Sequence, residues 1–249
     1  MATRDDVGVV TTCSGEEQME WLRSRLARSS NRWVHYVDEL LPSGYDSYLR
    51  LFHPFVPWES EIAEPVPRDR LRSWETLAGE AGVVFHGELQ WNSLKSVVPI
   101  LPDGGRRYAT FEGQIERSTA NIMMSVLATS GPSQRVLFIY SHPGLMTPHD
   151  EPIAYLGEPQ DFDAVIEVAG LPGPTCIWPE DRRWLVATDF DMPSTYIACD
   201  AFTCDALMVE SGLETVAVSL NTRIDQGSDQ LNGTGYSEDY KPRSKWWRR

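Results

Sequence analysis

The chain has 249 residues, of which 41% are hydrophobic and 23% charged, and it carries a formal net charge of −14. These fractions are close to globular averages, so they exclude a disordered chain and a fibrous repeat. The length is enough for one large domain or two small ones, and such a chain can bury a core without disulfides or a structural metal.

The first predicted elements are a helix and a hairpin. Ser14-Gly-Glu-Glu has the spacing of a capping box and is followed by apolar residues at helical intervals, which predicts a helix over residues 15–29. Residues 32–40 and 45–52 are rich in aromatic and β-branched side chains on either side of a segment with Pro and Gly. They predict an early hairpin.

Two helices and two strands are predicted in the middle of the chain. Apolar residues at helical spacing predict a short helix from residue 71 that ends near Gly79 or Gly82, and residues 83–91 predict a returning strand. The apolar stripe of residues 118–129, followed by Gly-Pro, predicts a longer helix. The continuous apolar run of residues 135–140 predicts a buried strand.

A loop and a second hairpin are predicted next. Closely spaced prolines predict a loop over residues 142–162, and residues 164–169 then predict a strand. Residues 183–191 and 195–199 are strand-like segments separated by Met-Pro-Ser, so they predict a hairpin.

The predicted C-terminal elements complete the fold. Asp200 is expected to cap a helix over residues 201–211, Gly212 to end it in the left-handed conformation, and residues 216–220 to form a last strand. Helices and hairpins follow one another without the regular spacing of βαβ units. We therefore expect an α+β fold, with a largely antiparallel sheet, hairpins and three to four packed helices.

The chain is expected to divide into a globular part and a polar tail. Residues 1–220 are predicted to form a single globular α+β domain, in which the Pro-rich region near 130–160 offers a subdivision. Residues 221–249 are predicted to form a polar flexible tail that ends in a basic, Trp-rich segment.

The cysteines and the N-terminal residues indicate a compartment. The sequence does not begin with a basic region and an apolar stretch, and no stretch approaches the roughly 20 apolar residues of a membrane span. We therefore expect a cytoplasmic protein with no membrane partner, in which the cysteines are thiols. The cysteines are Cys13, Cys176, Cys199 and Cys204.

Two carboxylates near the second hairpin are the best candidates for catalysis. Asp189 and Asp191 stand at i and i+2 of a predicted strand, so their side chains would point to one face, about 6–7 Å apart at the Cα atoms. Such a pair can hold a divalent cation or divide the acid and base roles of a hydrolase. The alternative, which we favour, is that both aspartates cap the turn and contact water.

Aromatic and basic residues near this pair are candidates for a ligand or partner surface. Trp178, Trp184 and Tyr196 could line a groove beside the aspartates, because aromatic rings offer broad contact surface to a cation or a flat ligand. Arg182 and Arg183 precede the pair and could form ion pairs with neighbouring acids. The alternative is that the aromatic residues fill the core, which their alternating strand positions favour.

The sequence contains no complete set of catalytic, metal or cofactor residues. His142 and His149 lie in a Pro-rich segment without the spacing of a metal pair, and the neighbouring serine is not in a nucleophile elbow. His53 and His86 stand beside apolar residues and are expected to be hydrogen-bonded packing residues. The cysteines at 199 and 204 lack two further ligands for zinc, and glycine motifs for phosphate or dinucleotides are absent. We expect no cofactor and no metal.

The C-terminal segment is basic, whereas the rest of the chain is acidic. Five of the 22 basic residues lie in it, so residues 1–240 carry a charge of −19. A body this acidic argues against nucleic-acid binding and favours basic protein partners. The segment could fold back on its own surface, self-associate with a neighbouring subunit, stack on bases, enter a membrane interface, or serve only as a solubilising end. Its candidate contact residues are Lys241, Arg243, Lys245, Trp246, Trp247, Arg248 and Arg249.

Two blocks of the sequence resemble an uncharacterised protein family common in actinobacteria. The blocks are GYDSYLRLFHP at residues 44–54 and WPEDRRWLVATDFDMPSTY at residues 178–196, with Leu213-Glu214 downstream. Members of that family continue with small residues, often Gly-Gly, where this chain has Ala198-Cys199. The resemblance implies no established activity. A short Leu-Pro-x-x-Tyr stretch is also similar to the SUKH group of immunity and scaffold proteins.

These observations lead to three hypotheses of function. The leading one is a non-enzymatic binding or regulatory protein that acts on a protein partner through an acidic, aromatic-containing surface. The second is a hydrolytic enzyme that uses Asp189 and Asp191. The third is contact with nucleic acid or membrane through residues 241–249.

Overall fold

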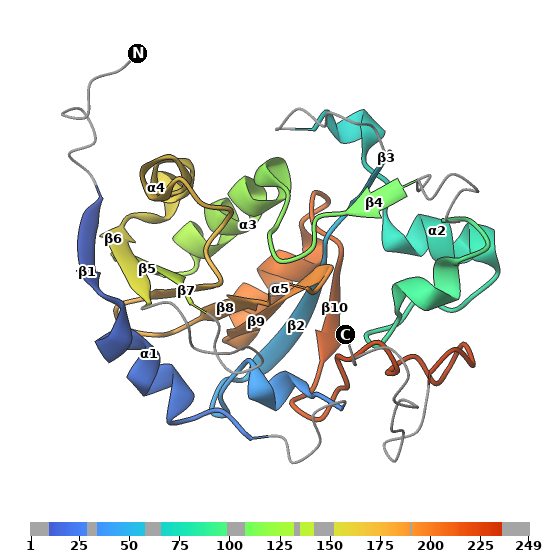
Figure 1. The fold of residues 1–249 in the computed structure, drawn as a ribbon, viewed down its shortest axis with the longest axis horizontal. Coiled ribbons are helices and arrows are strands. Elements are labelled where there is room, and N and C mark those ends of the chain that lie inside the picture. The colour runs from blue at the N-terminus through green and yellow to red at the C-terminus, as the bar shows by residue number, and fades with distance from the viewer. Residues whose placement is uncertain are drawn as a thin grey trace, which may run out of the picture.

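The computed structural model describes residues 10–28, 34–57, 66–98, 108–131, 135–141, 152–189 and 191–235 of the chain (Figure 1). Its strands are β1 (Thr11–Ser14), β2 (Ser47–Phe52), β3 (Phe55–Pro57), β4 (Tyr108–Thr110), β5 (Val136–Tyr140), β6 (Ile153–Gly157), β7 (Cys176–Pro179), β8 (Leu185–Thr188), β9 (Ser194–Cys199) and β10 (Thr215–Val218). Its α-helices are α1 (Gly15–Arg23), α2 (Trp74–Ala81), α3 (Arg117–Thr129), α4 (Phe162–Ala169) and α5 (Ala201–Val209). The short 3₁₀ helices are η1 (Val37–Glu39), η2 (Arg68–Arg70), η3 (Trp91–Leu94) and η4 (Pro159–Asp161).

One large antiparallel sheet organises the described residues. Eight of their strands form it in the order β1-β6-β5-β7-β8-β9-β2-β10, and every neighbouring pair runs antiparallel. β3 and β4 form a separate antiparallel pair. Helices packed on a large antiparallel sheet confirm the predicted α+β fold. None of the described helices combines the length and the apolar character that a membrane span requires.

The sheet separates two hydrophobic cores. Because successive side chains of a strand point to opposite faces, Leu185 and Ala187 of β8 enter one core and Val186 enters the other. The core around Val186, here called the first core, is covered by α3, α4 and α5. The second core is covered by α1 and η1. Figure 1 shows α1 and α3 on opposite sides of the sheet.

Capping residues determine where the helices begin. The hydroxyl of Ser14 and the carboxylates of Glu116 and Asp200 accept hydrogen bonds from backbone N–H groups in the first turns of α1, α3 and α5. Ser73 does the same for α2, which ends at Gly82 with φ of 70°. These four predicted helices are confirmed, although α1 ends before the expected residue 29.

A third apolar cluster lies at the end of β2. The ring of Trp74 lies against Phe52 and Phe55, with centroid distances of 5.1 Å and 4.8 Å. Apolar residues of α2 and of residues 83–98 close over these rings. The cluster draws residues from α2 and β3, and Figure 1 shows α2 and the β3–β4 pair on one side of the molecule.

Two strands predicted in the first hundred residues are wrong. Residues 37–39 form η1 rather than a hairpin strand, because Val37, Leu40 and Leu41 recur at helical spacing and enter the second core together. β2 pairs with β9 and β10 instead. Residues 83–91 do not form a strand either, because the segment turns back on itself, where the N–H of Leu89 donates to the carbonyl oxygen of His86 at 3.0 Å.

Two further predictions in the second half of the chain are wrong. Residues 153–157, expected in a loop, form β6 between β1 and β5. Residues 164–169, expected as a strand, belong to α4, because Phe162 and Val165 are one turn apart and both enter the first core. Gly170, with φ of 61°, ends that helix.

The C-terminal third follows its prediction more closely. β8 and β9 form the expected hairpin, and α5 and β10 lie where the sequence predicts them. The prediction for Gly212 is wrong, because α5 already ends at Val209 and Gly212 is not among the glycines with positive φ.

Residues 221–235 are packed against the body of the protein, although a flexible tail is predicted from 221. Ser228 and Asp229 are fully buried. The Asn232 side chain donates to the carbonyl oxygen of Val84 at 3.0 Å and accepts from its N–H at 2.9 Å. The polar groups of this segment therefore bond other parts of the chain instead of water. Amino-acid composition alone does not reveal such contacts. The remainder of the predicted tail lies outside the described residues.

Arg50 of β2 joins the sheet to the third cluster. Its side chain is 1% exposed. Nε donates to Ser194 Oγ at 2.9 Å, and Nη1 donates to the carbonyl oxygens of Gly87 and Leu89 at 2.9 Å each. The guanidinium carbon lies 4.1 Å from the centroid of the Phe52 ring. Burial lowers the pKa of Arg50, but a guanidinium stays charged in proteins, so the buried charge depends on these acceptors.

Replacing this guanidinium is expected to destabilise the whole fold. Arg50→Met fills similar space but leaves the acceptors without a donor, so we expect the free energy of unfolding to fall by about 3–5 kcal/mol. Urea unfolding followed by circular dichroism measures this loss. Arg72→Met is the matched control, because Arg72 pairs with Glu80 at the surface and should cost about 1 kcal/mol or less. Equal losses in the two variants would contradict the assigned role of Arg50.

Candidate functional site

The two candidate carboxylates lie in different surroundings. β8 ends at Thr188, so the strand alternation that would place both side chains on one face does not extend to Asp189 and Asp191. Asp189 is fully buried, whereas Asp191 is exposed. The backbone N–H of Met192 donates to the carbonyl oxygen of Asp189 at 3.1 Å, which closes a turn. The shared face that the catalytic hypothesis requires is therefore absent from this hairpin. The favoured alternative is wrong for Asp189, which is too deeply buried to contact water.

The three aromatic candidates lie in the cores. Trp178 and Tyr196 enter the second core and are 0% and 1% exposed. Trp184 is 2% exposed and enters the first core, on the opposite face of the sheet. The three rings therefore do not line one groove, and the structure places them as the core interpretation expects.

Of the remaining candidates from the sequence, the structure describes Arg182 and Arg183. Arg183 donates to the carboxylate of Asp181, whereas the guanidinium of Arg182 lies over the ring of Trp21. His142, His149 and the tail residues 241–249 lie outside the described residues.

His53 is a buried packing residue, as predicted. Its Nδ1 lies 2.6 Å from the carbonyl oxygen of Phe111, and its Nε2 lies 2.9 Å from Thr195 Oγ1. A carbonyl oxygen only accepts, so Nδ1 carries the proton and Nε2 accepts from the Thr195 hydroxyl. That hydroxyl in turn accepts from Thr188 at 2.6 Å. Burial lowers the pKa of His53 to about 4, against the opposing effect of the Phe111 hydrogen bond.

Ser93, His86 and Asp229 meet in an order that does not suit nucleophilic catalysis. Asp229 accepts from the Ser93 hydroxyl and, at 2.9 Å, from His86 Nε2. His86 Nδ1 accepts from the N–H of Glu88 at 3.3 Å, so the imidazole bonds the carboxylate rather than the serine. Burial raises the pKa of Asp229, but hydrogen bonds from Ser93, Asn232 and His86 hold it below its usual value. The carboxylate is therefore an anchor for residues 221–235.

The cysteines are free thiols, as the sequence predicts. Burial raises the pKa of Cys176 and of Cys199 to about 12, so both are protonated at neutral pH. Among the residues that the structure describes, no group of three or more His, Cys, Asp or Glu side chains is placed to hold a metal ion.

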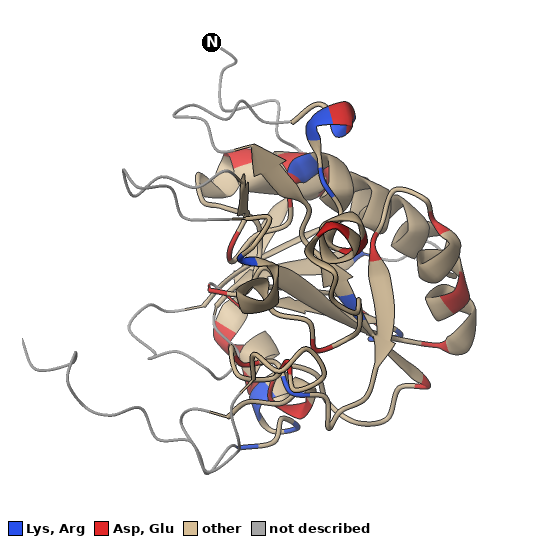
Figure 2. Ribbon diagram, turned by 90° about the vertical axis from the view of Figure 1, so that its right-hand side faces the viewer, with Lys and Arg blue, Asp and Glu red and all other residues tan. Residues whose placement is uncertain are grey.

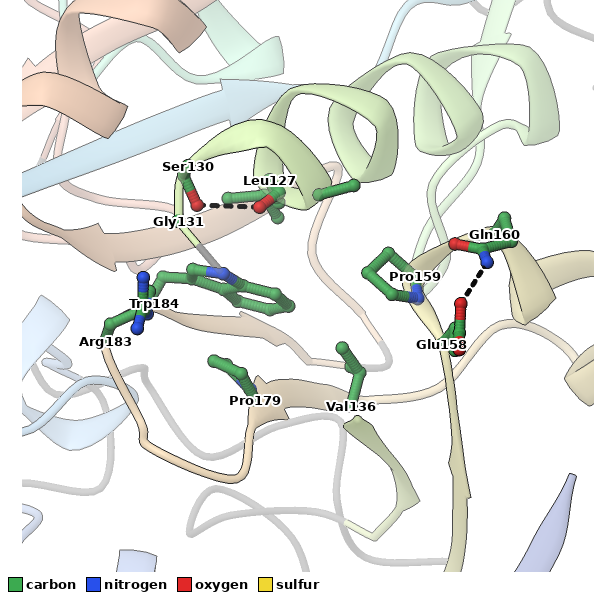
Figure 3. A pocket seen from close by; sticks show the side chains of 11 residues that line it. Leu127, Ser130, Gly131, Val136, Glu158, Pro159, Gln160, Pro179, Arg183 and Trp184 are labelled. Carbon is green, nitrogen blue, oxygen red and sulfur yellow. Dashed lines mark hydrogen bonds between the residues drawn. The ribbon is translucent and has the colours of Figure 1, made fainter. Parts of the chain in front are cut away.

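A small cavity of about 170 Å³ lies beside Trp184 (Figure 3). Figure 3 shows its indole between Leu127 at the end of α3 and Pro179 at the end of β7. The polar groups around it bond one another: Ser130 Oγ donates to the carbonyl oxygen of Leu127, and the Gln160 amide donates to the Glu158 carboxylate. The cavity is smaller than the ~300 Å³ of typical ligand pockets, so it is a poor candidate.

A larger cavity of about 430 Å³ lies near the N-termini of α2 and α3 and the start of β10. The Glu214 carboxylate accepts from the backbone N–H groups of Trp74 and Glu75 at 2.7 Å and 2.6 Å. Burial raises the pKa of Glu214, and these hydrogen bonds oppose that shift. A carboxylate of the chain itself thus fills the position at the start of α2 where an anion would bind.

The outer face of α5 exposes large apolar side chains. Phe202 is 72% exposed, Met208 48% and Val209 81%, and Asp205 is exposed between them. Phe202, Asp205 and Val209 share one side of the helix, because i, i+3 and i+7 lie one above another. We call Phe202, Asp205, Met208 and Val209 the α5 face. The sequence predicted this helix but not its outer face, and the signal was the lack of a polar stripe in residues 201–209.

A groove lies between α3 and the end of α5, where Glu210 directly follows Val209 of the α5 face. It has a volume of about 480 Å³ and is lined by Ile122, Val126 and polar residues of α3, with Glu210 at the end of α5. Figure 2 shows Asp and Glu distributed over helices and loops rather than gathered at one place. The α5 face carries Asp205 beside its apolar residues, and the groove carries Glu210 beside Ile122 and Val126.

Comparison with known proteins adds no relatives. No protein-family model matches the chain, and no curated protein or solved structure matches it. The sequence blocks at residues 44–54 and 178–196 lie on paired strands of the sheet, since the first includes β2 and the second includes β8 and the start of β9.

The buried His53 is expected to make stability depend on pH. Its pKa is about 4 in the folded chain and 6.5 in an unfolded one, so below pH 6.5 the unfolded chain gains a proton that the folded chain does not. The free energy of unfolding should fall as the pH drops from 6.5 to 4, by about 3 kcal/mol from this residue. Urea unfolding across this range, with His53→Asn for comparison, measures the effect.

The amide introduced by His53→Asn can still donate to the carbonyl oxygen of Phe111, but it does not titrate. The variant is expected to be less stable at pH 7 and to show a flatter dependence on pH, so that the two curves converge near pH 4. Parallel curves would show that His53 is not held neutral by burial.

Proposed function

We propose that this protein is a non-enzymatic binding or regulatory protein that docks a protein partner on the α5 face and the adjoining groove. The observation that carries this proposal is the high exposure of Phe202 and Val209 on a helix whose inner side belongs to the first core. Clustered exposed apolar side chains in a folded protein mark interaction sites more often than isolated ones do. The two side chains stand about 10 Å apart along the helix, a spacing that suits helix-on-helix contact.

The acidic side chains of α5 and its end favour a basic partner on this side of the helix, whereas Arg68 and Arg72 line the cavity next to Met208. Asp205 lies between Phe202 and Val209, and Glu210 borders the groove. A partner helix that buries the apolar side chains must therefore bring Lys or Arg against these carboxylates, since unpaired buried charge is costly. The charge of −19 on residues 1–240 adds long-range attraction for such a segment. We assign the site to an amphipathic helix with apolar anchors beside basic residues.

A second copy of this chain is a less suitable occupant. Two α5 helices related by a two-fold axis would place Asp205 near its own counterpart at the centre of the contact. Like charges brought together in this way oppose association. The same apolar area covered by a basic helix meets no such repulsion.

Other features support binding rather than catalysis, in a reducing compartment. Asp189 and Asp191 do not share a face, and Asp229 separates His86 from Ser93. The cysteines are free thiols, which fits the cytoplasm, where we place this function.

A designed peptide tests the proposal directly. The probe is a fluorescently labelled amphipathic helix of Leu and Lys, and its control has Glu at every Lys position. The full chain is expected to bind the Lys peptide, more weakly at high salt, and not the Glu peptide. Phe202→Ser and Val209→Ser should each weaken binding about 10-fold, because the apolar anchors supply most of the affinity.

Leu231→Ser is the matched control, since Leu231 is 63% exposed but lies outside α5. It should leave peptide binding unchanged. Circular dichroism checks that all three variants fold. Equal weakening by Leu231→Ser, or no binding of the Lys peptide by the full chain, would refute the assignment. Self-association of the full chain that Phe202→Ser abolishes, seen by sedimentation, would assign the α5 face to a second copy instead.

A further inference from the structure

Arg182 is held in an unusual backbone conformation. Among the described residues, it is the one residue other than glycine with a positive φ, 58°. The left-handed region costs free energy for a side chain with a Cβ atom, and Gly or Asn would fit this turn better. The N–H of Arg182 donates to the carbonyl oxygen of Pro179 at 2.8 Å, and the carbonyl oxygen of Arg182 accepts from Tyr45 Oη at 2.8 Å. Strain of this kind points to a use for the side chain.

The Arg182 side chain lies on a rigid aromatic platform. Its guanidinium carbon is 4.2 Å from the centroid of the Trp21 ring. Trp21 in turn lies against the fully buried Trp178 of β7, with ring centroids 5.4 Å apart. The position of the guanidinium is therefore fixed by a stack that begins in the second core.

A second guanidinium shares this platform. The guanidinium carbon of Arg25 lies 5.2 Å from the centroid of Trp21, and Nη1 donates to the carbonyl oxygen of the same residue at 3.1 Å. Arg25 and Arg182 both act to lower the pKa of Tyr45, although its burial, the largest influence, raises that pKa to about 12. Both cations therefore lie near one phenol oxygen, and so does the carboxylate of Asp181, which acts to raise the same pKa.

The neighbouring acids are already engaged. Asp181 accepts from Arg183, and Glu16 pairs with Arg23 at 2.8 Å. Within the described part of the chain, neither Arg25 nor Arg182 forms an ion pair with a carboxylate. Two cations thus lie on one ring, on a body of charge −19, and the nearby Asp181 carboxylate is bound by a third cation, Arg183.

We propose that Arg25 and Arg182, on the Trp21 platform, form a binding site for a doubly charged oxyanion of the phosphate monoester class. Guanidinium groups bind phosphate oxygens through paired N–H donors. A phosphate dianion has enough charge to neutralise both cations, whereas a carboxylate neutralises only one. The acidic body does not prevent this, because salt screens charges beyond about 8 Å at physiological ionic strength. This site is separate from the α5 face, which lies over the other core.

Inorganic phosphate is the probe that tests this site. In the full chain labelled with ¹⁵N-tryptophan, the indole N–H signal of Trp21, assigned with Trp21→Phe, is followed by NMR at constant ionic strength. Phosphate is expected to shift the signal saturably in the millimolar range. Acetate at the same ionic strength should shift it at least several-fold more weakly, which separates a phosphate from a carboxylate source.

Matched variants decide whether Arg182 is responsible. Arg182→Asn removes the cation and places a residue that tolerates the left-handed backbone, so the turn should remain folded. It is expected to weaken phosphate binding about 10-fold, as loss of a charged hydrogen bond does. Arg183→Gln, next to it but engaged with Asp181, should leave binding within about 2-fold of the original. A non-saturable shift, an equal effect of both variants, or tighter binding of acetate would overturn the proposal.

Discussion

The buried guanidinium of Arg50 links parts of the chain that are far apart in sequence. From β2 it reaches Ser194 at the start of β9 and the carbonyl oxygens of Gly87 and Leu89. A charge removed from water is tolerated only where its donors meet acceptors, so this loop must turn these two carbonyl groups inward. The same loop then receives residues 221–235 through further hydrogen bonds. The C-terminal segment thus packs on a loop that also bonds a charge within the sheet.

The spacing of apolar residues predicted the elements that follow a single pattern along their length, the helical one in α3 and the strand one in β8 and β9. Residues 164–169 were predicted wrongly because they are apolar at nearly every position, so their β-branched residues favour a strand. Only the packing of Phe162 and Val165 on the first core selects a helix. The prediction of a flexible tail for residues 221–235 was wrong for the opposite reason. Their polar side chains are satisfied by residues about 140 positions away, and local composition contains no sign of such contacts.

The candidate site shows a similar division between what spacing can and cannot tell. The sequence placed Trp178 and Trp184 near strands, but which core each enters depends on how the strands pair. The aspartate pair depended on a strand that continues past Thr188, and the turn begins there instead. The apolar outer side of α5 was visible in the sequence as a missing polar stripe. The left-handed backbone of Arg182 was not, because arginine is not a residue that indicates such a turn.

The two proposed surfaces lie over opposite faces of one sheet, which bears on how they can act together. The α5 face belongs to a helix on the first core, and the Trp21 platform belongs to the second. The β7–β8 turn carries Arg182, while β9 leads through Asp200 directly into α5. Close-packed cores on both sides leave this sheet little room to deform, so the sheet should hold the surfaces apart rather than couple them. A basic helix and an anionic ligand could then be bound at the same time, because neither occupies the other's space and salt screens their charges from one another.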